Sequence, residues 1–204
     1  TIKDRNKNPG YSRYTQQLFM SQLSDKDFSV FQEKMFRFPG FYVQKRSVRE
    51  YVYPYAAHVL GDVGEVSPSD IEEDDYYQPG DYIGKLGLEK HYEKELRGTK
   101  GVKIMLRDAR GRIQGSYQNG KLDQRPVAGK DLTLGIDVNL QALGERLLQG
   151  KIGSIVAIDP RDGSVLAMVS SPSYDPRRLV GKNRGKMHKW LSQNPWKPLL
   201  NRSI

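Results

Sequence analysis

Apolar residues mark one hairpin most clearly, within residues 153–176. Ile155–Asp159 and Ser164–Ser170 are two runs rich in β-branched and other apolar residues, a composition typical of strands. Between them, Pro160-Arg161-Asp162-Gly163 is a turn sequence, because Pro presets φ and Gly accepts a positive φ. Both faces of the second run are apolar, so we predict an antiparallel hairpin at the centre of a sheet, covered on both sides.

Helical spacing of apolar residues predicts three longer helices. Ser24 has an acid three residues later, as in a capping box, and the helix that it opens ends at Phe38-Pro39-Gly40. Gly84–Gly98 is the clearest predicted helix, since leucine and tyrosine recur on one face and glycine follows its end. Asp137 caps a third, leucine-rich helix, which Gly150 ends.

Shorter predicted elements fill the remainder of the chain. In order, we expect an extended segment over 41–53, a helical turn over 56–60, a short helix opened by Ser67-Pro68, a hairpin of 102–106 with 113–117, a strand over 132–136 and a helix around 187–192. Mixed short helices and antiparallel hairpins indicate an α+β fold. The polar stretch 121–130 is the predicted boundary between a domain of residues 1–125 and a second of residues 126–204.

Composition narrows the class of protein. Apolar residues make up 37% and charged residues 28% of the 204 residues. We therefore expect a solvent-exposed surface that is large relative to the buried apolar core. No apolar run approaches the ~20 residues of a membrane helix, and the polar start carries no signal peptide, so we expect residue 1 to lie inside a longer protein. Cysteine is absent, which excludes disulfides, thiol catalysis and cysteine-bound zinc and fits an oxidising compartment.

The net charge of +9 is unevenly distributed. Nine acidic residues and no Lys or Arg lie in residues 50–84, whereas eight Lys or Arg and no acid follow Asp175. A face that binds a polyanion uniformly would not include so long an acidic block, so we interpret the basic end as a solvated surface or one that faces acidic partners. Nucleic-acid binding is less favoured, because Trp190 and Trp196 are spaced like core anchors rather than a stacking array.

Metal and cofactor sites are not indicated. His58, His91 and His188 are scattered, without the spacing of a metal site, and are interpreted as surface or packed histidines. The acidic run Glu72-Glu73-Asp74-Asp75 lacks the spacing of a calcium loop and is interpreted as a solvated loop. Neither common glycine-rich phosphate-binding pattern occurs, so we expect no metal and no cofactor.

Six separated motifs resemble those of one family. They are Phe38-Pro39-Gly40; Tyr53–Gly64, YPYAAHVLGDVG; Ile83–Gly98, IGKLGLEKHYEKELRG; Leu132–Asp137 with Leu140-Gln141; the hairpin followed by Ser171–Pro176, SPSYDP; and Pro198–Ile204, PLLNRSI. They occur in the order of the class B penicillin-binding proteins, with Gly135 as an insertion into the family pattern. The chain is similar to that family from about residue 24 onward.

This resemblance implies the organisation and role of a parent protein. Residues 1–125 would be the non-catalytic pedestal, or dimerisation domain, and residues 126–204 the incomplete first edge of the transpeptidase α/β sheet. The parent would be anchored in the inner membrane by a helix that precedes this chain, and would face the periplasm. It would cross-link peptidoglycan stem peptides through an acyl-serine, bind β-lactams, and act in cell elongation and shape maintenance with a glycosyltransferase partner docked on the pedestal.

No catalytic residue is carried over from the family to this chain. The family's nucleophile motif is Ser-x-x-Lys, in which one helical turn brings the amine to the hydroxyl, and no serine here has Lys three residues later. Lys-[Ser/Thr]-Gly is also absent, and Ser192-Gln193-Asn194 matches Ser-x-Asn by chance, because no nucleophile precedes it. We therefore expect the chain to stop before the nucleophile and to be inactive.

Two alternatives belong to other functional classes. The chain could be a self-contained basic module for nucleic acid or an anionic wall polymer, whose binding would fall steeply with salt. It could also be a serine enzyme with an unrecognised nucleophile, for which Ser170 or Ser171 at a strand end is the candidate. In the preferred interpretation, the hairpin over Ile155–Ser170 has an uncovered apolar edge, which predicts aggregation or homo-oligomers.

Overall fold

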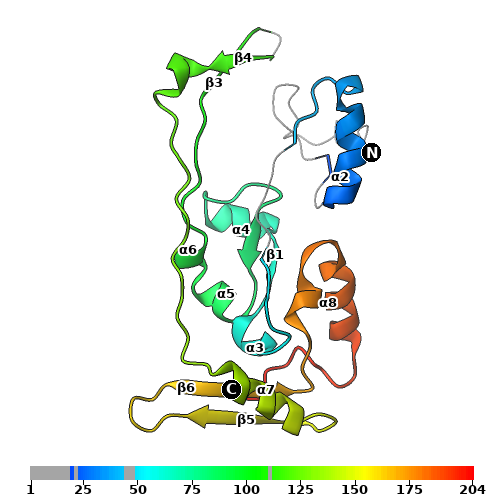
Figure 1. Cartoon of the computed structure of the whole chain (residues 1–204), viewed down its shortest axis with the longest axis vertical. Helices are drawn as coiled ribbons and strands as arrows, with labels where there is room; N and C mark the ends of the chain where they lie inside the picture. Colours follow the sequence, from blue (N-terminus) through cyan, green and yellow to red (C-terminus); the bar gives the residue numbers. More distant parts are fainter. Residues whose placement is uncertain (1–18, 21–22, 44–48, 110–111) are drawn as a thin grey trace.

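The computed structural model of the chain describes residues 19–20, 23–43, 49–109 and 112–204. The molecule is elongated, and Figure 1 shows two hairpins at its opposite ends. One end, called the head, comprises the described parts of residues 19–43 and residues 102–123 and holds α2 (Asp25–Lys34), η1 (Met35–Arg37), β3 (Met105–Arg107), β4 (Ile113–Ser116) and η2 (Tyr117–Gly120). The other end, called the base, holds α7 (Val138–Leu147), β5 (Gly153–Ile158) and β6 (Val165–Ser171).

The middle of the molecule connects the head and the base. It holds α3 (Ala57–Leu60), β1 (Val63–Glu65), α4 (Pro68–Glu73), β2 (Tyr82–Gly84), α5 (Gly87–His91) and α6 (Glu93–Leu96). The C-terminal elements η3 (Pro176–Leu179), η4 (Gly181–Asn183) and α8 (Arg184–Gln193) lie beside this middle part (Figure 1). Two extended segments run up to the head and back, and are bridged at Thr99–Val127 and Val102–Gln124.

Local capping signals produce the helix starts that the sequence predicts. Ser24 accepts a hydrogen bond from the Asp27 amide at 3.2 Å and opens α2. Ser67 and Asp70 form a reciprocal capping box at α4, with Pro68 in the first turn. Asp137 Oδ1 accepts from two backbone amides of the first turn of α7. These predictions are confirmed, because a cap depends only on residues within one turn.

The helix predicted over Gly84–Gly98 is instead two short helices. α5 and α6 meet at Tyr92, whose φ of −106° and ψ of 24° interrupt the helix. Gly84 belongs to β2, which pairs antiparallel with β1. The Glu93 carboxylate accepts from the Gly84 amide and the Tyr77 hydroxyl, both at 2.8 Å, and so ties the start of α6 to β2. Tertiary hydrogen bonds therefore override the helical periodicity here.

Two predicted strand assignments are wrong in detail. Residues 132–136 form no strand, and the nearest ladder-like bond is from the Asp137 amide to the Leu166 carbonyl at 2.8 Å. The second hairpin pairs Met105–Arg107 with Ile113–Ser116, so residues 102–104 lie outside it. The segment 41–53, which was predicted to be extended, contains no helix in its described residues and pairs with no strand, and residues 44–48 lie outside the described part.

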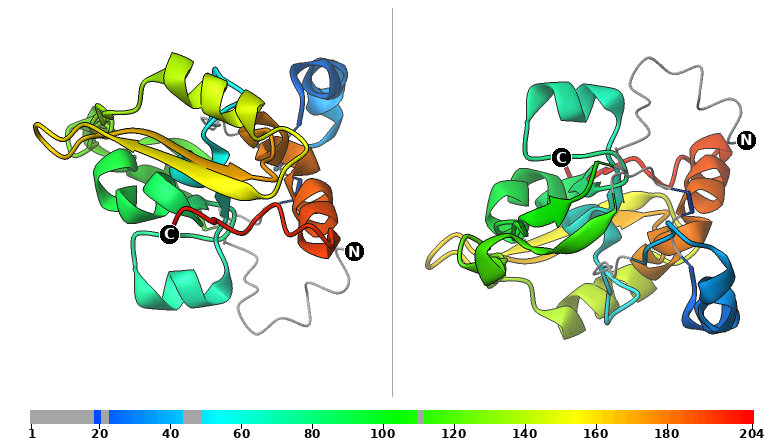
Figure 2. Two further views of the ribbon diagram at one scale, coloured as in Figure 1. Left: turned by 90° about the horizontal axis from the view of Figure 1, so that it is seen from below. Right: turned by 90° about the horizontal axis from the view of Figure 1, so that it is seen from above.

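The hairpin of the base is confirmed, with β5 and β6 antiparallel from Gly153–Ser171 to Ile158–Val165. Figure 2 shows α7 on one face of this hairpin and the helices of the middle part on the other, and both α7 and α3 contact β6. The prediction that both faces of the second strand are covered is thus confirmed for β6. Its predicted position at the centre of a sheet is wrong, because among the described residues the sheet has only these two strands. Ile158 of β5 is accordingly 57% exposed.

The buried core is small and is divided among the middle, the base and the C-terminal elements. Its apolar members are Tyr51, Ala57, Tyr77, Ala167, Val169, Leu179 and Leu191. In the described part of the chain, no helix is both long and apolar enough to cross a bilayer. The mixture of short helices with three antiparallel strand pairs confirms the predicted α+β class.

Candidate interaction surface and polar junction

The head carries an aromatic cluster that is only partly buried. The ring of Phe38 lies 5.8 Å from that of Phe31 and 6.0 Å from that of Phe41, and Phe41 meets Phe19 at 5.3 Å. Phe36 is 79% exposed, and α2 contains no buried residue. Burial of a large apolar side chain contributes about 1.5–3 kcal/mol, so this cluster leaves much of its possible stabilisation unused.

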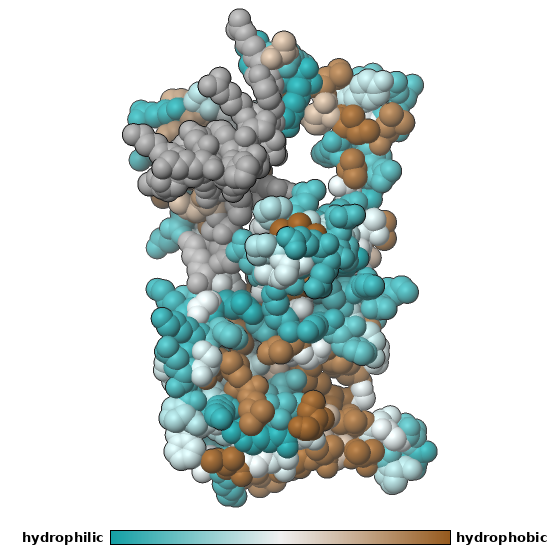
Figure 3. Space-filling model, turned by 180° about the vertical axis from the view of Figure 1, so that it is seen from behind, coloured by the Kyte–Doolittle hydropathy of each residue, from teal (hydrophilic) through white to brown (hydrophobic). Residues whose placement is uncertain are grey.

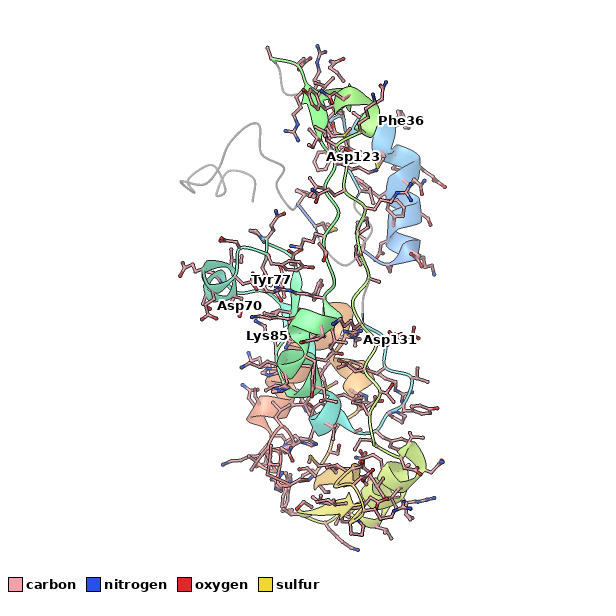
Figure 4. All side chains as sticks on the ribbon, turned by 90° about the vertical axis from the view of Figure 1, so that its left-hand side faces the viewer. Phe36, Asp70, Tyr77, Lys85, Asp123 and Asp131 are labelled. Atoms are coloured by element: carbon pink, nitrogen blue, oxygen red, sulfur yellow. The ribbon has the colours of Figure 1, made fainter. Side chains whose placement is uncertain are left out.

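The β3 strand of the head and the extended segments next to it also carry exposed apolar side chains. All three residues of β3 are exposed, as are several neighbouring apolar side chains on the same extended region: Val102, Ile104, Tyr117 and Leu122. Brown apolar residues are visible over the β3–β4 end in Figure 3, and Figure 4 places Phe36 and Asp123 together at this end. The Asp123 carboxylate accepts from the Ile104 amide at 3.0 Å and holds the two extended segments together. A concentration of exposed apolar side chains on a polar protein is typical of a protein-binding surface.

A second feature is a polar junction between the middle and the C-terminal elements. Asp62, which is 1% exposed, accepts from two nitrogens of Arg184, with Nε at 2.9 Å. Its Oδ1 is buried without a hydrogen-bond partner among the described residues. A Cβ on Gly64 would lie 2.7 Å from the Arg184 guanidinium carbon, so glycine lets the guanidinium lie against β1.

His58 and Tyr174 extend this junction. The His58 Nε2 donates to the Pro198 carbonyl at 2.7 Å, and its ring lies 5.3 Å from the Tyr174 ring. Burial lowers the pKa of His58 below its ordinary value, and the nearby Arg202 acts in the same direction. Burial, with the Asp62 carboxylate as a smaller cause, raises the pKa of Tyr174 to about 12. Both side chains are therefore neutral at pH 7 and act as packing and hydrogen-bonding groups.

A chain of hydrogen bonds joins residues 56–64, the segment that contains His58 and Asp62, to the base. The Ala56 amide donates to Glu145 Oε1 at 2.7 Å, and Gln141 Nε2 donates to the same oxygen at 3.1 Å. Gln141, which is 1% exposed, also bonds both the carbonyl and the amide of Met168 in β6, at 3.0 and 2.9 Å. Residues 56–64 are thus held on one side by α7 and on the other by α8.

The two candidate nucleophiles are used as structural hydrogen-bond donors. The Ser170 hydroxyl donates to the Leu200 carbonyl at 3.1 Å and accepts from the Arg202 amide. The Ser171 hydroxyl lies within 3.1 Å of the Leu148 carbonyl and 2.7 Å of the Lys151 carbonyl. Both serines are buried, and none of these partners is a base that could remove a hydroxyl proton. This geometry gives the serine-enzyme alternative no support.

The other candidate residues from the sequence are separated in space or paired within the fold. His91 packs its ring 4.8 Å from Tyr92, and Ser192 donates to the Lys189 carbonyl at the end of α8. In the acidic run, Asp74 pairs with Arg97 at 2.6 Å. The described residues contain no group of three His, Cys, Asp or Glu side chains that could hold a metal ion.

Sequence reasoning missed the residues of the junction. Asp62 lies within the Tyr53–Gly64 motif, but Arg184, its partner 122 positions away, belongs to none of the six motifs, so the sequence does not indicate that the two pair. Gln141 gave one usable signal, because it belongs to the Leu140-Gln141 motif and is a polar residue next to the leucine face of the predicted helix. A buried amide in such a position must find partners, which Met168 and Glu145 provide.

Two family descriptions match successive parts of the chain. Residues 1–134 match the penicillin-binding protein dimerisation domain, and residues 153–202 match the penicillin-binding protein transpeptidase domain. A curated relative is the peptidoglycan D,D-transpeptidase MrdA of Acinetobacter baumannii, 37% identical over 187 residues, which are 89% of this chain and 27% of the relative. The chain therefore spans less than a third of this relative's length.

Solved structures agree with the sequence relatives. A complex between penicillin-binding protein 2 and MreC from Helicobacter pylori matches with a TM-score of 0.73 and 29% identity, over 88% of this chain and 33% of that one. A peptidoglycan synthase complex that coordinates polymerisation and crosslinking matches with a TM-score of 0.62 and 28% identity, over 89% of this chain and 34% of that one. These findings confirm the resemblance noted from the motifs, and the dimerisation-domain match alone covers residues 1–134 of 204. The chain belongs to the penicillin-binding protein family.

Proposed function

We propose that this chain is part of a peptidoglycan D,D-transpeptidase of the penicillin-binding protein 2 type, and that its elongated part is the non-catalytic pedestal. The whole enzyme would cross-link stem peptides through an acyl-serine during cell elongation. The family membership and the MrdA relatives support this proposal. They offer nothing in favour of a self-contained nucleic-acid module.

The proposed role of the pedestal is to space the catalytic domain from the inner membrane and to dock a partner of the elongation machinery. The exposed apolar surface of the head carries this proposal, because a polar protein leaves such side chains uncovered where another protein packs on them. Two relatives were solved as assemblies, one with MreC and one as a peptidoglycan synthase complex. We propose that residues 1–125 are the pedestal and that residues 126–204 begin the transpeptidase domain.

The docking role is tested by binding of the purified chain to the periplasmic part of MreC from the same organism. Leu106→Asp and Phe36→Asp place a charge on the exposed apolar head, and each is expected to weaken binding at least about tenfold. Ile158→Asp is the matched control, since Ile158 is an exposed apolar residue of the base. Equal weakening by all three variants, or none by the head variants, would contradict docking through the head.

The non-catalytic role is tested by intact mass after incubation with benzylpenicillin. We expect a species near 23.3 kDa without an adduct, because the chain contains no Ser-x-x-Lys. A penicillin adduct on this species would mean that a nucleophile lies within these residues. The matched positive control is the full-length enzyme, which is expected to gain one adduct.

A further inference from the structure

An open groove lies between η3 and α8, outside the head and the junction. It has a volume of about 480 Å³ and is lined by Arg177, Arg178, Val180, Asn183, Lys186, Met187 and Trp190. This volume falls in the range of about 300–1,000 Å³ that is usual for small-ligand clefts. Three of its seven lining residues are cationic, and none is acidic.

The periodicity of α8 explains why these side chains share a face. Lys186 and Trp190 are four residues apart, and Met187 and Trp190 three, so they lie next to one another on the helix. Leu191 of α8 and Leu179 of η3 are both buried, and the two elements contact each other, which fixes the helix against the turn. Trp190 is 60% exposed, so it is not the core anchor that the sequence predicted, and its indole remains available on the outer face.

The charges of the groove are largely uncompensated. Arg177 forms three hydrogen bonds with the Asp175 carboxylate, at 2.8 to 3.1 Å, and is neutralised by it. The side chains of Arg178 and Lys186 are exposed, and neither forms an ion pair or a hydrogen bond with another described residue, although Arg178 is close enough to Asp175 to contribute to the lowered pKa of that carboxyl. The groove thus offers two exposed cationic side chains without ion-pair partners among the described residues, beside an exposed aromatic ring and the apolar Val180 and Met187.

We propose that this groove binds an uncross-linked glycan strand with carboxylate-bearing stem peptides. The apolar face of a sugar ring would stack on Trp190, and peptide carboxylates would pair with Arg178 and Lys186. The choice of this ligand rests on the proposed function, which makes such strands the substrate. The groove would hold the strand beside the pedestal while the catalytic domain acts on it.

Charge and position favour this ligand over other anions. A nucleic acid needs a long cationic track with several stacking rings, whereas this groove offers one exposed indole next to a middle part rich in acids.

The test uses tryptophan emission, because the chain has only Trp190 and Trp196. Trp196→Phe leaves Trp190 as the reporter, and Trp190→Phe leaves Trp196, which does not line the groove. The probe is a set of soluble peptidoglycan fragments of a few disaccharides with free stem peptides. We expect a saturable emission change in Trp196→Phe, no change in Trp190→Phe, and weaker calorimetric binding by Trp190→Phe.

A pair of double variants with equal charge change separates a site from general attraction. Arg178→Gln with Lys186→Gln should weaken binding about tenfold or more, whereas Lys121→Gln with Arg125→Gln, which are exposed elsewhere, should change it less than about twofold. Equal weakening of binding by the two double variants, or an unchanged Trp190 emission on addition of the fragments, would overturn the proposal. An emission change with duplex DNA or phosphatidylglycerol vesicles as large as that with the fragments would also overturn it. The MreC and penicillin experiments do not involve the groove, so their outcomes are independent of this one.

Discussion

The carboxylate of Asp62 and the guanidinium of Arg184 join two parts of the chain that are 122 residues apart. Asp62 lies in the loop before β1 and is almost fully buried, while Arg184 is the first residue of α8. The pair is therefore the main electrostatic link between the middle of the molecule and the segment that follows the base hairpin. A buried charge needs its partner, because desolvation without a counter-charge is costly.

Removal of this pair is predicted to loosen the C-terminal elements. Asp62→Ala leaves the guanidinium without its counter-charge and should lower the unfolding free energy by ~3 kcal/mol, measured by urea denaturation. Hydrogen exchange should increase most over residues 174–204. Arg161→Gln, which removes an ion pair of an exposed turn, is the matched control and should not move the midpoint measurably. Equal effects of the two variants would contradict the prediction.

Substitution of Gln141 tests the link between α7 and β6. Gln141→Leu conserves the volume of the side chain but removes its bonds to the amide and carbonyl of Met168. We expect a loss of ~2–3 kcal/mol, because both backbone groups lose a partner in a part-buried site. Gln149→Leu, at an exposed position just after the same helix, should change stability by less than about 0.5 kcal/mol. A Gln141→Leu variant with an unchanged free energy of unfolding would contradict the prediction and would show that water replaces these bonds.

Gly61 is predicted to be intolerant of any side chain. Its φ is +82°, and an added Cβ would lie 1.8 Å from the Leu86 carbonyl oxygen, which is backbone and has little freedom to move. Gly61→Ala should therefore abolish the cooperative thermal transition, or lower its midpoint by more than about 10 °C. Gly185→Ala, in α8 and with open space around the Cβ, should be neutral or raise the midpoint. A folded, wild-type-like Gly61→Ala protein would contradict the close approach of these two loops.

The pKa of Tyr174 predicts a stability change at high pH. Burial raises this pKa to about 12, above the ordinary value of 10, so the folded state holds the proton more tightly than the unfolded state does. The contribution is fully present below pH 10 and is lost as the pH rises from about 10 to 12. Urea midpoints of the wild type should fall more steeply over this interval than those of Tyr174→Phe. If the urea midpoints of the two proteins fall in parallel over this interval, ionisation of Tyr174 does not destabilise the fold and the prediction is wrong.

Much of the local structure could be predicted from the sequence, because its causes lie within a few residues. Ser24, Ser67 and Asp137 cap helices through the amides of the next turn. The Asp162-Gly163 turn supplies a positive φ between two apolar runs, so the base hairpin follows from its own residues. The family motifs and the absence of a Ser-x-x-Lys nucleophile are likewise properties of the chain itself.

Only the tertiary structure decided which of these elements meet. Tyr92 interrupts a periodic helix because the carboxylate of Glu93 is held by Gly84 and Tyr77, and nothing near Tyr92 in the chain encodes those contacts. The pairing of Asp62 with Arg184 and the gathering of Arg178, Lys186 and Trp190 around a groove depend on how whole elements pack. Caps and turns are set by short-range sterics and hydrogen bonds, whereas buried partners at long separation are selected by burial and charge in three dimensions.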